Sequence, residues 1–241
     1  MCSSIALACA AGNGAVCFTF DDSHSKNWVA AIPLFQKYNG HASFFFSGQI
    51  DDGKIAAMKK LQQHGHTVGL HTLNHLSAVS VMKTRGPQWY MEKQVFSQLA
   101  VCTANGVKIR SFAYPNTRRT PDTDKVLFKH FDFLRAGTGV AQRSCRPKDN
   151  PGMYYPVAKL QSKMVLGGLG MGAYYNTDYA EIELALERAA KNNEVAVFFS
   201  HNIAPGAKHI HMPTEMLERL LKKAAALKMK IIGFEELTSL K

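Results

Sequence analysis

The sequence is poor in cysteine and has no long hydrophobic segment. Its 241 residues include five cysteines, Cys2, Cys9, Cys17, Cys102 and Cys145, and no two of them form a CxxC pair. That spacing argues against a disulfide framework and against a structural zinc site. No apolar run approaches the roughly 20 residues that a membrane-spanning helix needs. Because no repeat or low-complexity linker interrupts the chain either, we expect a single domain over residues 1–241.

The first 14 residues, MCSSIALACAAGNG, lack the basic region and the long apolar core of a complete secretion signal. Three interpretations of this segment stay open. It is the remnant of a trimmed leader, the mature end of a lipoprotein that begins at Cys2, or an N-terminal strand or extension. Contact with a membrane is expected only if Cys2 carries a lipid anchor.

The net charge of +11 is concentrated in one part of the chain. Between Lys108 and Asp149 there are ten Lys or Arg residues against four Asp or Glu residues. Two interpretations stay open, an anionic partner and a solvated basic surface. No basic run is interleaved with aromatic residues as in many nucleic-acid sites, so nucleic-acid binding is not expected.

Short apolar runs rich in β-branched and aromatic residues alternate with amphipathic stretches. The runs predict strands at residues 15–20, 41–48, 66–70, 109–114, 131–137, 195–201 and 229–234. The stretches predict helices at residues 28–38, 51–64, 88–103, 122–129, 178–192 and 213–227. The remaining long segments, 77–88, 137–175 and 203–212, are expected to be loops. This alternation predicts an α/β fold of parallel βα units, and seven or eight such units predict a closed or nearly closed barrel.

Polar residues with reactive side chains come directly after four of the predicted strands. They are Asp21 and Asp22, His71 and His75, Pro115 and Asn116, and His201. In barrels of parallel strands the carboxyl ends of the strands form the rim on which active sites are built. The sequence therefore predicts that these residues meet at one mouth.

Three of these residues suit a catalytic metal ion. His71 and His75 are four residues apart, a spacing that places both imidazoles on one face of a helix. Asp22 would complete a set of two histidines and one carboxylate, which leaves a coordination position for water. Asp21 would then be free to act on that water. Packing explains two adjacent carboxylates after an apolar strand poorly, because buried unpaired charge is costly.

Four short motifs resemble, in order and spacing, those of the polysaccharide deacetylase family, carbohydrate esterase family 4. They are TFDD (Thr19 to Asp22), GHTVGLHTLNH (Gly65 to His75), FAYP (Phe112 to Pro115) and FFSH (Phe198 to His201). The likeness runs from Val16 to about Leu237. It implies a distorted (β/α) barrel with seven to eight parallel strands and an enzyme that removes acetyl groups from N-acetylated or O-acetylated polysaccharide or oligosaccharide.

The resemblance also implies roles for individual residues. Asp22, His71 and His75 look like the ligands of a divalent metal, most often Zn²⁺, although Co²⁺, Ni²⁺ or Fe²⁺ suits the same donors. Asp21 looks like the general base and His201 like the general acid. The expected partner is an acetylated glycan, and an extracytoplasmic location is expected, with a cytoplasmic one left open. The oligomeric state and the exact substrate are not predicted.

The third motif departs from the family pattern. Ala113 stands where the family has an arginine that holds the base, and Asn116 and Thr117 stand where it has Tyr-Gly. The backbone N–H of Asn116 could still serve as the oxyanion donor, because a backbone group survives a change of side chain. Arg110, Arg118 and Arg119 are the candidate replacements for the missing arginine, and we do not rank them. The family's fourth motif is not evident in FDFLRAGTG, where Asp132 and Arg135 are the nearest candidates.

Two other functions stay open. One is a catalytically silent carbohydrate-binding barrel, which the altered third motif would favour. The other is a metal-free amidase of related fold, in which the histidine ligands would not be expected together. Among the remaining histidines, His66 is expected to be structural.

Overall fold

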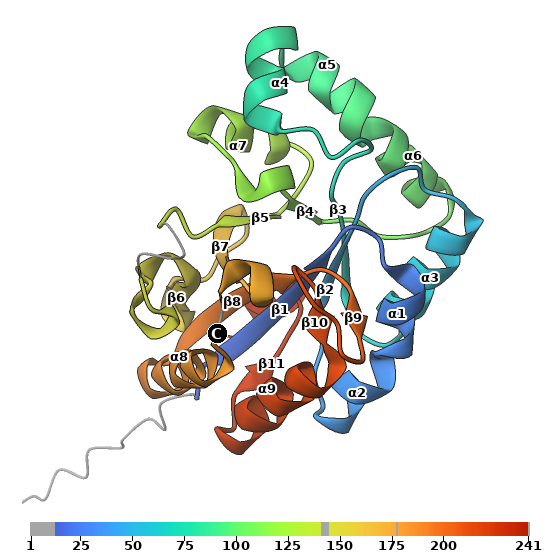
Figure 1. The fold of residues 1–241 in the computed structure, drawn as a ribbon. Coiled ribbons are helices and arrows are strands. Elements are labelled where there is room, and N and C mark those ends of the chain that lie inside the picture. Colours follow the sequence, from blue (N-terminus) through green and yellow to red (C-terminus); the bar gives the residue numbers. More distant parts are fainter. Residues whose placement is uncertain (1–12, 141–144, 177, 241) are drawn as a thin grey trace, which may run out of the picture.

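The computed structural model describes residues 13–140, 145–176 and 178–240. Its centre is a closed barrel of seven parallel strands, in which the last strand pairs back onto the first (Figure 1). In barrel order the strands are β1 (Ala15–Asp21), β2 (Ser43–Phe46), β3 (Thr67–Leu70), β4 (Ser111–Ala113), β5 (Phe133–Gly137), β7 (Met164–Gly170) and β8 (Glu194–Ser200). The predicted α/β barrel is confirmed.

Two further strands extend the sheet outside the closed ring. β11 (Lys230–Ile231) lies parallel to the start of β1, and β6 (Tyr154–Pro156) lies antiparallel to the start of β8. On β1, Ala15 and Val16 pair with β11, whereas Thr19 to Asp21 pair with β2. One edge of β1 is thus shared by two short strands, which makes the barrel irregular. β9 (Ile203–Ala204) and β10 (Met212–Pro213) form a separate parallel pair.

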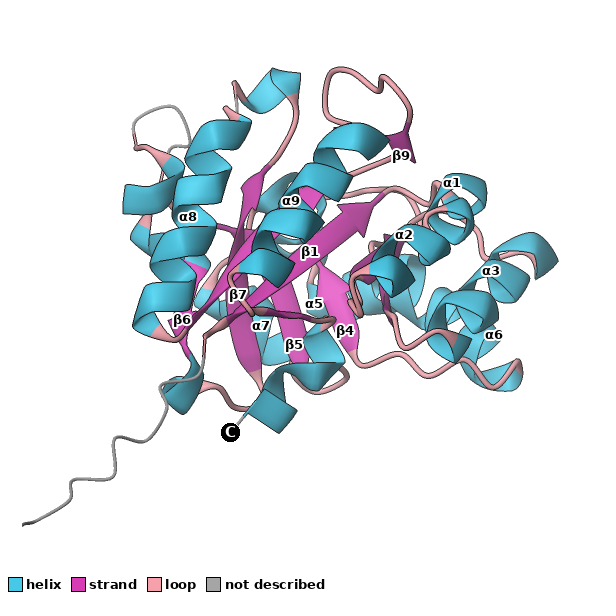
Figure 2. Ribbon diagram, turned by 90° about the horizontal axis from the view of Figure 1, so that it is seen from below, coloured by secondary structure: helices cyan, strands magenta, loops and turns pink. Residues whose placement is uncertain are grey.

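Helices surround the strands on the outside (Figure 2). They are α1 (Ser25–Ala30), α2 (Ile32–Lys37), α3 (Asp52–Gln63), α4 (Ala78–Arg85), α5 (Pro87–Met91), the π turn η1 (Glu92–Phe96), α6 (Ser97–Ala104), α7 (Pro121–Leu127), α8 (Tyr179–Asn192) and α9 (Thr214–Ala226). Short 3₁₀ turns are η2 (Pro115–Thr117), η4 (Pro147–Asp149), η5 (Pro151–Met153), η6 (Val157–Lys159), η7 (Ala173–Tyr175) and η8 (Phe234–Leu240). Among the described residues, no helix combines the length and the apolar character that crossing a membrane requires.

The sequence forms this arrangement because strands and helices bury different patterns. Every residue of β1 is buried, as expected for a strand covered on both faces. α9 instead buries one stripe, Leu217, Leu220, Leu221 and Ala224, at the spacing of a helix that packs one side on a core. The amphipathic period therefore places α9 on the outside of the barrel.

Several expectations for individual elements were wrong. Segment 77–88 is not a loop, since it contains α4, and the helix expected at 28–38 is divided into α1 and α2. Pro33 lies in the first turn of α2, where its missing N–H is harmless, and it could not donate within a continuous helix. The helix expected at 88–103 is confirmed as a continuous helical run, and it contains a π turn that was not expected. The expectations for Cys2 and for the rest of residues 1–12 concern a part of the chain outside the described residues.

The largest error concerns segment 137–175, which contains the barrel strand β7. Its sequence, MVLGGLG, is unlike an ordinary strand because glycine is depleted from strand interiors. Here the glycine is required by close packing, since a side chain at Gly167 would meet the backbone carbonyls of Gly152 and Gly137. Glycine in this strand marks close approach of another backbone segment.

A glycine in β3 gives a test of how tightly the barrel is packed. A methyl group at Gly69 would lie 2.6 Å from the Phe45 ring and 2.6 Å from the carbonyl oxygen of Ser111. We expect Gly69→Ala to lower the free energy of unfolding by about 1–3 kcal/mol, as overpacked cores do. Urea denaturation measures the loss. Gly53→Ala in α3 is the control, because the nearest atom there is a side-chain oxygen at 3.3 Å. Equal stability of the two variants would contradict the close packing.

Candidate functional site

Five of the predicted site residues meet at the rim formed by the carboxyl ends of the strands. Asp21 is the last residue of β1 and Asp22 follows it, while His71 follows β3 and His201 follows β8. β8 is hydrogen-bonded to β1, so barrel closure brings His201 beside the two aspartates. The predicted convergence of these side chains is confirmed in the described structure.

Asp22 is the centre of this cluster. Its Oδ1 lies 3.6 Å from Nε2 of His71 and 3.8 Å from Nε2 of His75, and its Oδ2 lies 3.6 Å from Nε2 of His201. The residue has a positive φ of 76°, which turns the chain sharply after the buried strand. Asp22 is one-third exposed, whereas Asp21 and His71 are buried. One carboxylate therefore faces three imidazoles.

The donor atoms of Asp22, His71 and His75 all lie within 4.8 Å of one another. Bonds of ~2.0–2.1 Å in a tetrahedral zinc site place neighbouring donors about 3.4 Å apart. The 3.6 Å and 3.8 Å from Asp22 Oδ1 to the two imidazole nitrogens are close to that value. Nδ1 of His71 donates to the carbonyl oxygen of Ala113 at 2.8 Å, so its Nε2 keeps a free lone pair. Burial also lowers the pKa of His71, which favours the neutral form that a metal requires. These residues fit a divalent cation.

The spacing of His71 and His75 predicted that the two side chains share one face of a helix, but they do not. Residues 71–77 form an irregular loop, in which Thr72 and His75 adopt positive φ angles of 69° and 53°. The loop brings the rings together by a different route, with their centroids 4.9 Å apart. The predicted proximity is correct, and the predicted local structure is wrong.

Asp21 is held by Arg135, a residue of β5 that is completely buried. A terminal nitrogen of its guanidinium donates to Oδ2 of Asp21. Burial works to raise the pKa of Asp21, but the positive charge of Arg135 and its hydrogen bond to the carboxylate outweigh burial and leave the pKa below its usual value. Asp21 is therefore kept ionised inside the barrel mouth.

None of the three arginines proposed from sequence holds Asp21. Arg110 pairs with Asp132, Arg119 pairs with Asp124, and Arg118 lies at an adjacent cavity. Asp132 itself is bound to Arg110 and Lys163 outside the cluster. One feature of the sequence could have indicated Arg135 as the partner of Asp21, namely a charged residue within the otherwise apolar run FLRAG.

The register of the sheet explains why an arginine on β5, and not one on β4, pairs with Asp21. Arg135 on β5 is the direct partner of Ala113 on β4, the position at which the family pattern has its arginine. Side chains at paired positions of neighbouring strands leave the sheet on the same face. A guanidinium from β5 therefore reaches the space that a β4 arginine would occupy.

His201 is oriented by backbone groups. Its Nδ1 donates to the carbonyl oxygen of Ile210 at 3.1 Å, and Ser200 Oγ donates to the same oxygen at 2.9 Å. Nε1 of Trp28 donates to the carbonyl oxygen of His201 at 2.9 Å, so this tryptophan belongs to the core. His66 accepts a hydrogen bond from Ala42 N–H and is buried, which agrees with its expected structural role.

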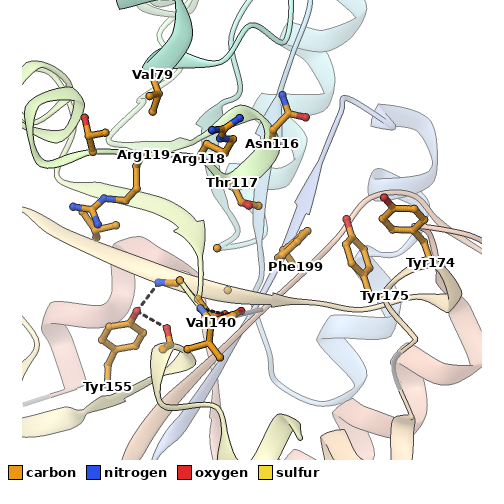
Figure 3. A pocket seen from close by; sticks show the side chains of 18 residues that line it. Val79, Asn116, Thr117, Arg118, Arg119, Val140, Tyr155, Tyr174, Tyr175 and Phe199 are labelled. Carbon is orange, nitrogen blue, oxygen red and sulfur yellow. Dashed lines mark hydrogen bonds between the residues drawn. The ribbon is translucent and has the colours of Figure 1, made fainter. Parts of the chain in front are cut away.

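A cavity of about 960 Å³ lies near the cluster, and Figure 3 shows the side chains that line it. Asn116 and Arg118 line one side, and Tyr174, Tyr175 and Phe199 line another. Phe199 connects the cavity to the cluster, since its ring centroid lies 6.3 Å from that of His201 and 4.8 Å from the guanidinium carbon of Arg135. Asn116, which follows β4, lines this cavity in a left-handed conformation with φ 55°.

The buried pair gives a stability test. We expect Arg135→Met to lower the free energy of unfolding by about 3–5 kcal/mol, because it leaves the Asp21 carboxylate buried without its partner. Urea denaturation near pH 7 measures the effect. The double variant Asp21→Asn/Arg135→Met removes both charges and should regain much of the loss. A double variant no more stable than the single one would show that the pair is not what is lost.

The family model for polysaccharide deacetylases matches residues 10–130, which is half of the 241-residue chain. YxkH of Bacillus subtilis, which is provisionally named a polysaccharide deacetylase, is 35% identical to this chain over 65 residues. The match covers 25% of this chain and 23% of YxkH.

Solved structures show the same fold at low identity. The peptidoglycan deacetylase PdaC of Bacillus subtilis matches with a TM-score of 0.57 and 14% identity, covering 94% of this chain and 91% of that one. The polysaccharide deacetylase Bc1974 of Bacillus cereus gives 0.57 and 17%, covering 92% of each chain. BA3943, a CE4 family pseudoenzyme of Bacillus anthracis, gives 0.58 and 14%, covering 93% and 65%. On the family match over half its length, and in agreement with its barrel, the chain belongs to the polysaccharide deacetylase family.

Proposed function

We propose that this protein is a metal-dependent hydrolase that removes acetyl groups from N-acetylated or O-acetylated polysaccharide or oligosaccharide. The observation that carries the proposal is the cluster around Asp22, in which His71 and His75 offer metal-binding nitrogen atoms. Asp21 lies 3.9 Å from His71, and His201 lies 3.6 Å from Asp22. We also propose that the described residues form a single catalytic domain, because β8 near the end of the chain closes on β1.

Asp22, His71 and His75 would hold the cation, with Zn²⁺ the first candidate and Co²⁺, Ni²⁺ or Fe²⁺ also suited to these donors. When bound, such an ion supplies Lewis-acid polarisation of the acyl oxygen and lowers the pKa of a water molecule. The hydrogen bond from His71 to Ala113 supports this assignment, because it directs Nε2 toward the other two ligands.

Asp21 is proposed as the general base. Its Oδ2 is bound by Arg135 and lies 3.9 Å from Nε2 of His71, whereas its Oδ1 is buried and has no hydrogen-bond partner among the described residues. A buried acceptor without a partner is costly, so its retention here favours a role in the reaction. The carboxylate of Asp21 would accept the proton of the attacking water while Arg135 keeps it in place.

His201 is proposed as the general acid. Nδ1 donates to Ile210, and Nε2 faces Asp22 at 3.6 Å. With a proton on Nε2 as well, the imidazolium would donate that proton to the leaving nitrogen. Asp21 and His201 reach the site from neighbouring strands, so proton removal and proton delivery are assigned to different groups.

The backbone N–H of Asn116 is proposed as the oxyanion donor. Asn116 and Thr117 have φ angles of 55° and 58°, and such angles are rare outside glycine. Strained backbone of this kind persists where the surroundings hold it and is frequent at active sites. Gly137 leaves the space that the Thr117 side chain needs, since a methyl group there would lie 2.9 Å from Thr117 Oγ1.

The cavity supports a polymeric substrate. Its exposed Tyr174 and its wall of Tyr175 and Phe199 offer flat apolar surface for sugar rings. Arg118 lines the cavity and has no ion-pair partner among the described residues, so it could contact an anionic substituent. We propose an acetylated cell-wall polymer as substrate and an extracytoplasmic location, supported by the family and by the fold shared with a peptidoglycan deacetylase.

A silent carbohydrate-binding barrel is the second candidate, favoured by the altered third motif and by the fold shared with a pseudoenzyme. The altered third motif is a weaker argument once Arg135 is considered, because its guanidinium pairs with Asp21, the proposed base. The convergence of both histidines with Asp22 likewise weighs against a metal-free amidase. Acetate release from N-acetylglucosamine oligomers, acetylated xylan and peptidoglycan, measured together with metal content, separates these functions.

His75→Ala tests the metal site. This side chain is nearly half exposed, so its removal should leave the fold intact. We expect the variant to lose most of its bound metal and most of its acetate release, because two protein ligands remain where about three are needed. Elemental analysis of the purified protein and circular dichroism provide the two measurements. Stoichiometric metal in the folded variant would contradict the assignment of His75.

Asp21→Asn and His201→Ala test the two proton-transfer roles. Both variants should retain metal, because Asp22, His71 and His75 are unchanged. Asp21→Asn should lower turnover by about 10²–10⁴-fold, since an amide cannot accept the proton of water. An activated ester, whose leaving group needs no proton, should partly rescue His201→Ala and should not rescue Asp21→Asn. Loss of metal in Asp21→Asn with retention in Asp22→Asn would reverse the two aspartate roles.

A further inference from the structure

A buried glutamine outside the catalytic cluster holds the loop between the two histidines. Gln94 lies in the π turn Glu92–Phe96 and is 1% exposed. Its backbone carbonyl accepts a hydrogen bond from the N–H of Leu73 at 3.0 Å, and its side-chain Oε1 accepts one from the N–H of Asn74 at 3.0 Å. One residue therefore binds two successive amides of the segment from His71 to His75.

The π turn that carries the two Gln94 acceptors, its backbone carbonyl and its Oε1, is part of a continuous helix. In a π turn the hydrogen bonds run from residue i to i+5, so the regular α-helical pairing is interrupted, and such turns recur at functional sites. Met91 before the turn and Ser97 after it both have right-handed helical dihedral angles. The helical run from Pro87 to Ala104 is therefore continuous through the turn. Gln94 is fixed within a helix, and its partners are in a loop.

The loop from His71 to His75 needs contacts with other segments to hold its backbone conformation. Thr72 and His75 have positive φ angles, which L-residues rarely adopt unless their surroundings impose them. His71 has two anchors of its own, since its N–H donates to Phe46 O at 2.8 Å and its Nδ1 to Ala113 O at 2.8 Å.

His75 has no comparable anchor. Among the described residues, its side chain makes polar and ring contacts only with Asp22 and His71, and it is 43% exposed. The position of its imidazole is therefore set by the backbone that Gln94 holds.

A second buried glutamine extends this support. Gln98 lies one turn later in α6, and its Nε2 donates to the carbonyl oxygen of Gly48 at 2.7 Å. The N–H of Gly48 in turn donates to the carbonyl oxygen of Thr72 at 3.0 Å. The helix thus supports the histidine loop directly through Gln94 and indirectly through Gln98.

We propose that Gln94 is a positioning residue for the metal site, which preorganises His75 toward a divalent cation by fixing the backbone at Leu73 and Asn74. This inference rests on the proposed function, because it assumes that His75 is a ligand. Gln94 itself contacts neither the cation nor the substrate. Its contribution should appear as metal affinity.

The test compares three variants for zinc affinity and stability. Gln94→Met keeps the length of the side chain and removes its acceptor. It should weaken zinc binding by about 10–100-fold, the range typical of groups that orient metal ligands. Gln94→Glu keeps an acceptor oxygen at the same reach and should recover most of the affinity. Val95→Ala, at a buried position in the same turn, should lower stability and leave zinc affinity unchanged.

Zinc dissociation constants come from competition with a chromophoric chelator, and stability comes from urea denaturation of the metal-free proteins. Zinc affinity of Gln94→Met equal to that of the unaltered protein would overturn the inference and leave the proposed function intact. Failure of the unaltered protein to bind zinc, cobalt, nickel or iron would overturn the metal assignment and this inference together.

Amide hydrogen exchange in the metal-free protein gives a second measurement. The Asn74 amide should exchange faster in Gln94→Met than in Val95→Ala, because only the first variant removes its acceptor. Equal exchange of Asn74 in the two variants would contradict the proposed contact even if zinc affinity changed.

Discussion

The charges of Asp21 and Arg135 lie together inside the barrel mouth, where neither could remain alone. Removing a single ion from water costs several kcal/mol, and only close pairing with good geometry offsets that cost. The pair joins β1 to β5, two strands that are not neighbours in the sheet, so it links opposite parts of the barrel interior. It fixes the carboxylate whose neighbour, Asp22, is the centre of the histidine cluster. The geometry of the site therefore depends on this interior contact.

The same contact shows how a buried carboxylate can be paired by a guanidinium from a strand other than the one that carries the motif. Ala113 lacks the charged side chain that the family pattern places at this position, and Arg135, its partner on the neighbouring strand, carries one. A barrel interior is a small shared volume, lined at each level by side chains from several strands. What the carboxylate of Asp21 requires is a guanidinium at that level, whichever strand provides it. A motif within one segment does not show that the arginine is on another strand. The register of the sheet shows it, because Ala113 and Arg135 are paired.

The sequence was sufficient to predict the parts of the structure that depend on local pattern. The alternation of apolar runs with amphipathic stretches predicted the barrel, and the polar residues after each run predicted the meeting of Asp22, His71 and His201. The failures depend on distant contacts. β7 was missed because Gly167 accommodates the backbone of Gly152, a contact that is not visible in the strand's own sequence. The loop at His75 was mistaken for a helix because positive φ angles at non-glycine residues leave no compositional trace.

Trp28 has a consequence beyond its place in the core. The chain contains two tryptophans, and only this one is buried against the end of β8, with its indole N–H on the carbonyl of His201. Trp89 lies on α5 beneath the guanidinium of Arg85, far along the chain from that contact. A displacement of the His201 backbone would change the polarity and hydrogen bonding around a single buried indole. We therefore expect the fluorescence of Trp28 to respond to a change in the backbone of His201, the residue proposed to deliver the proton.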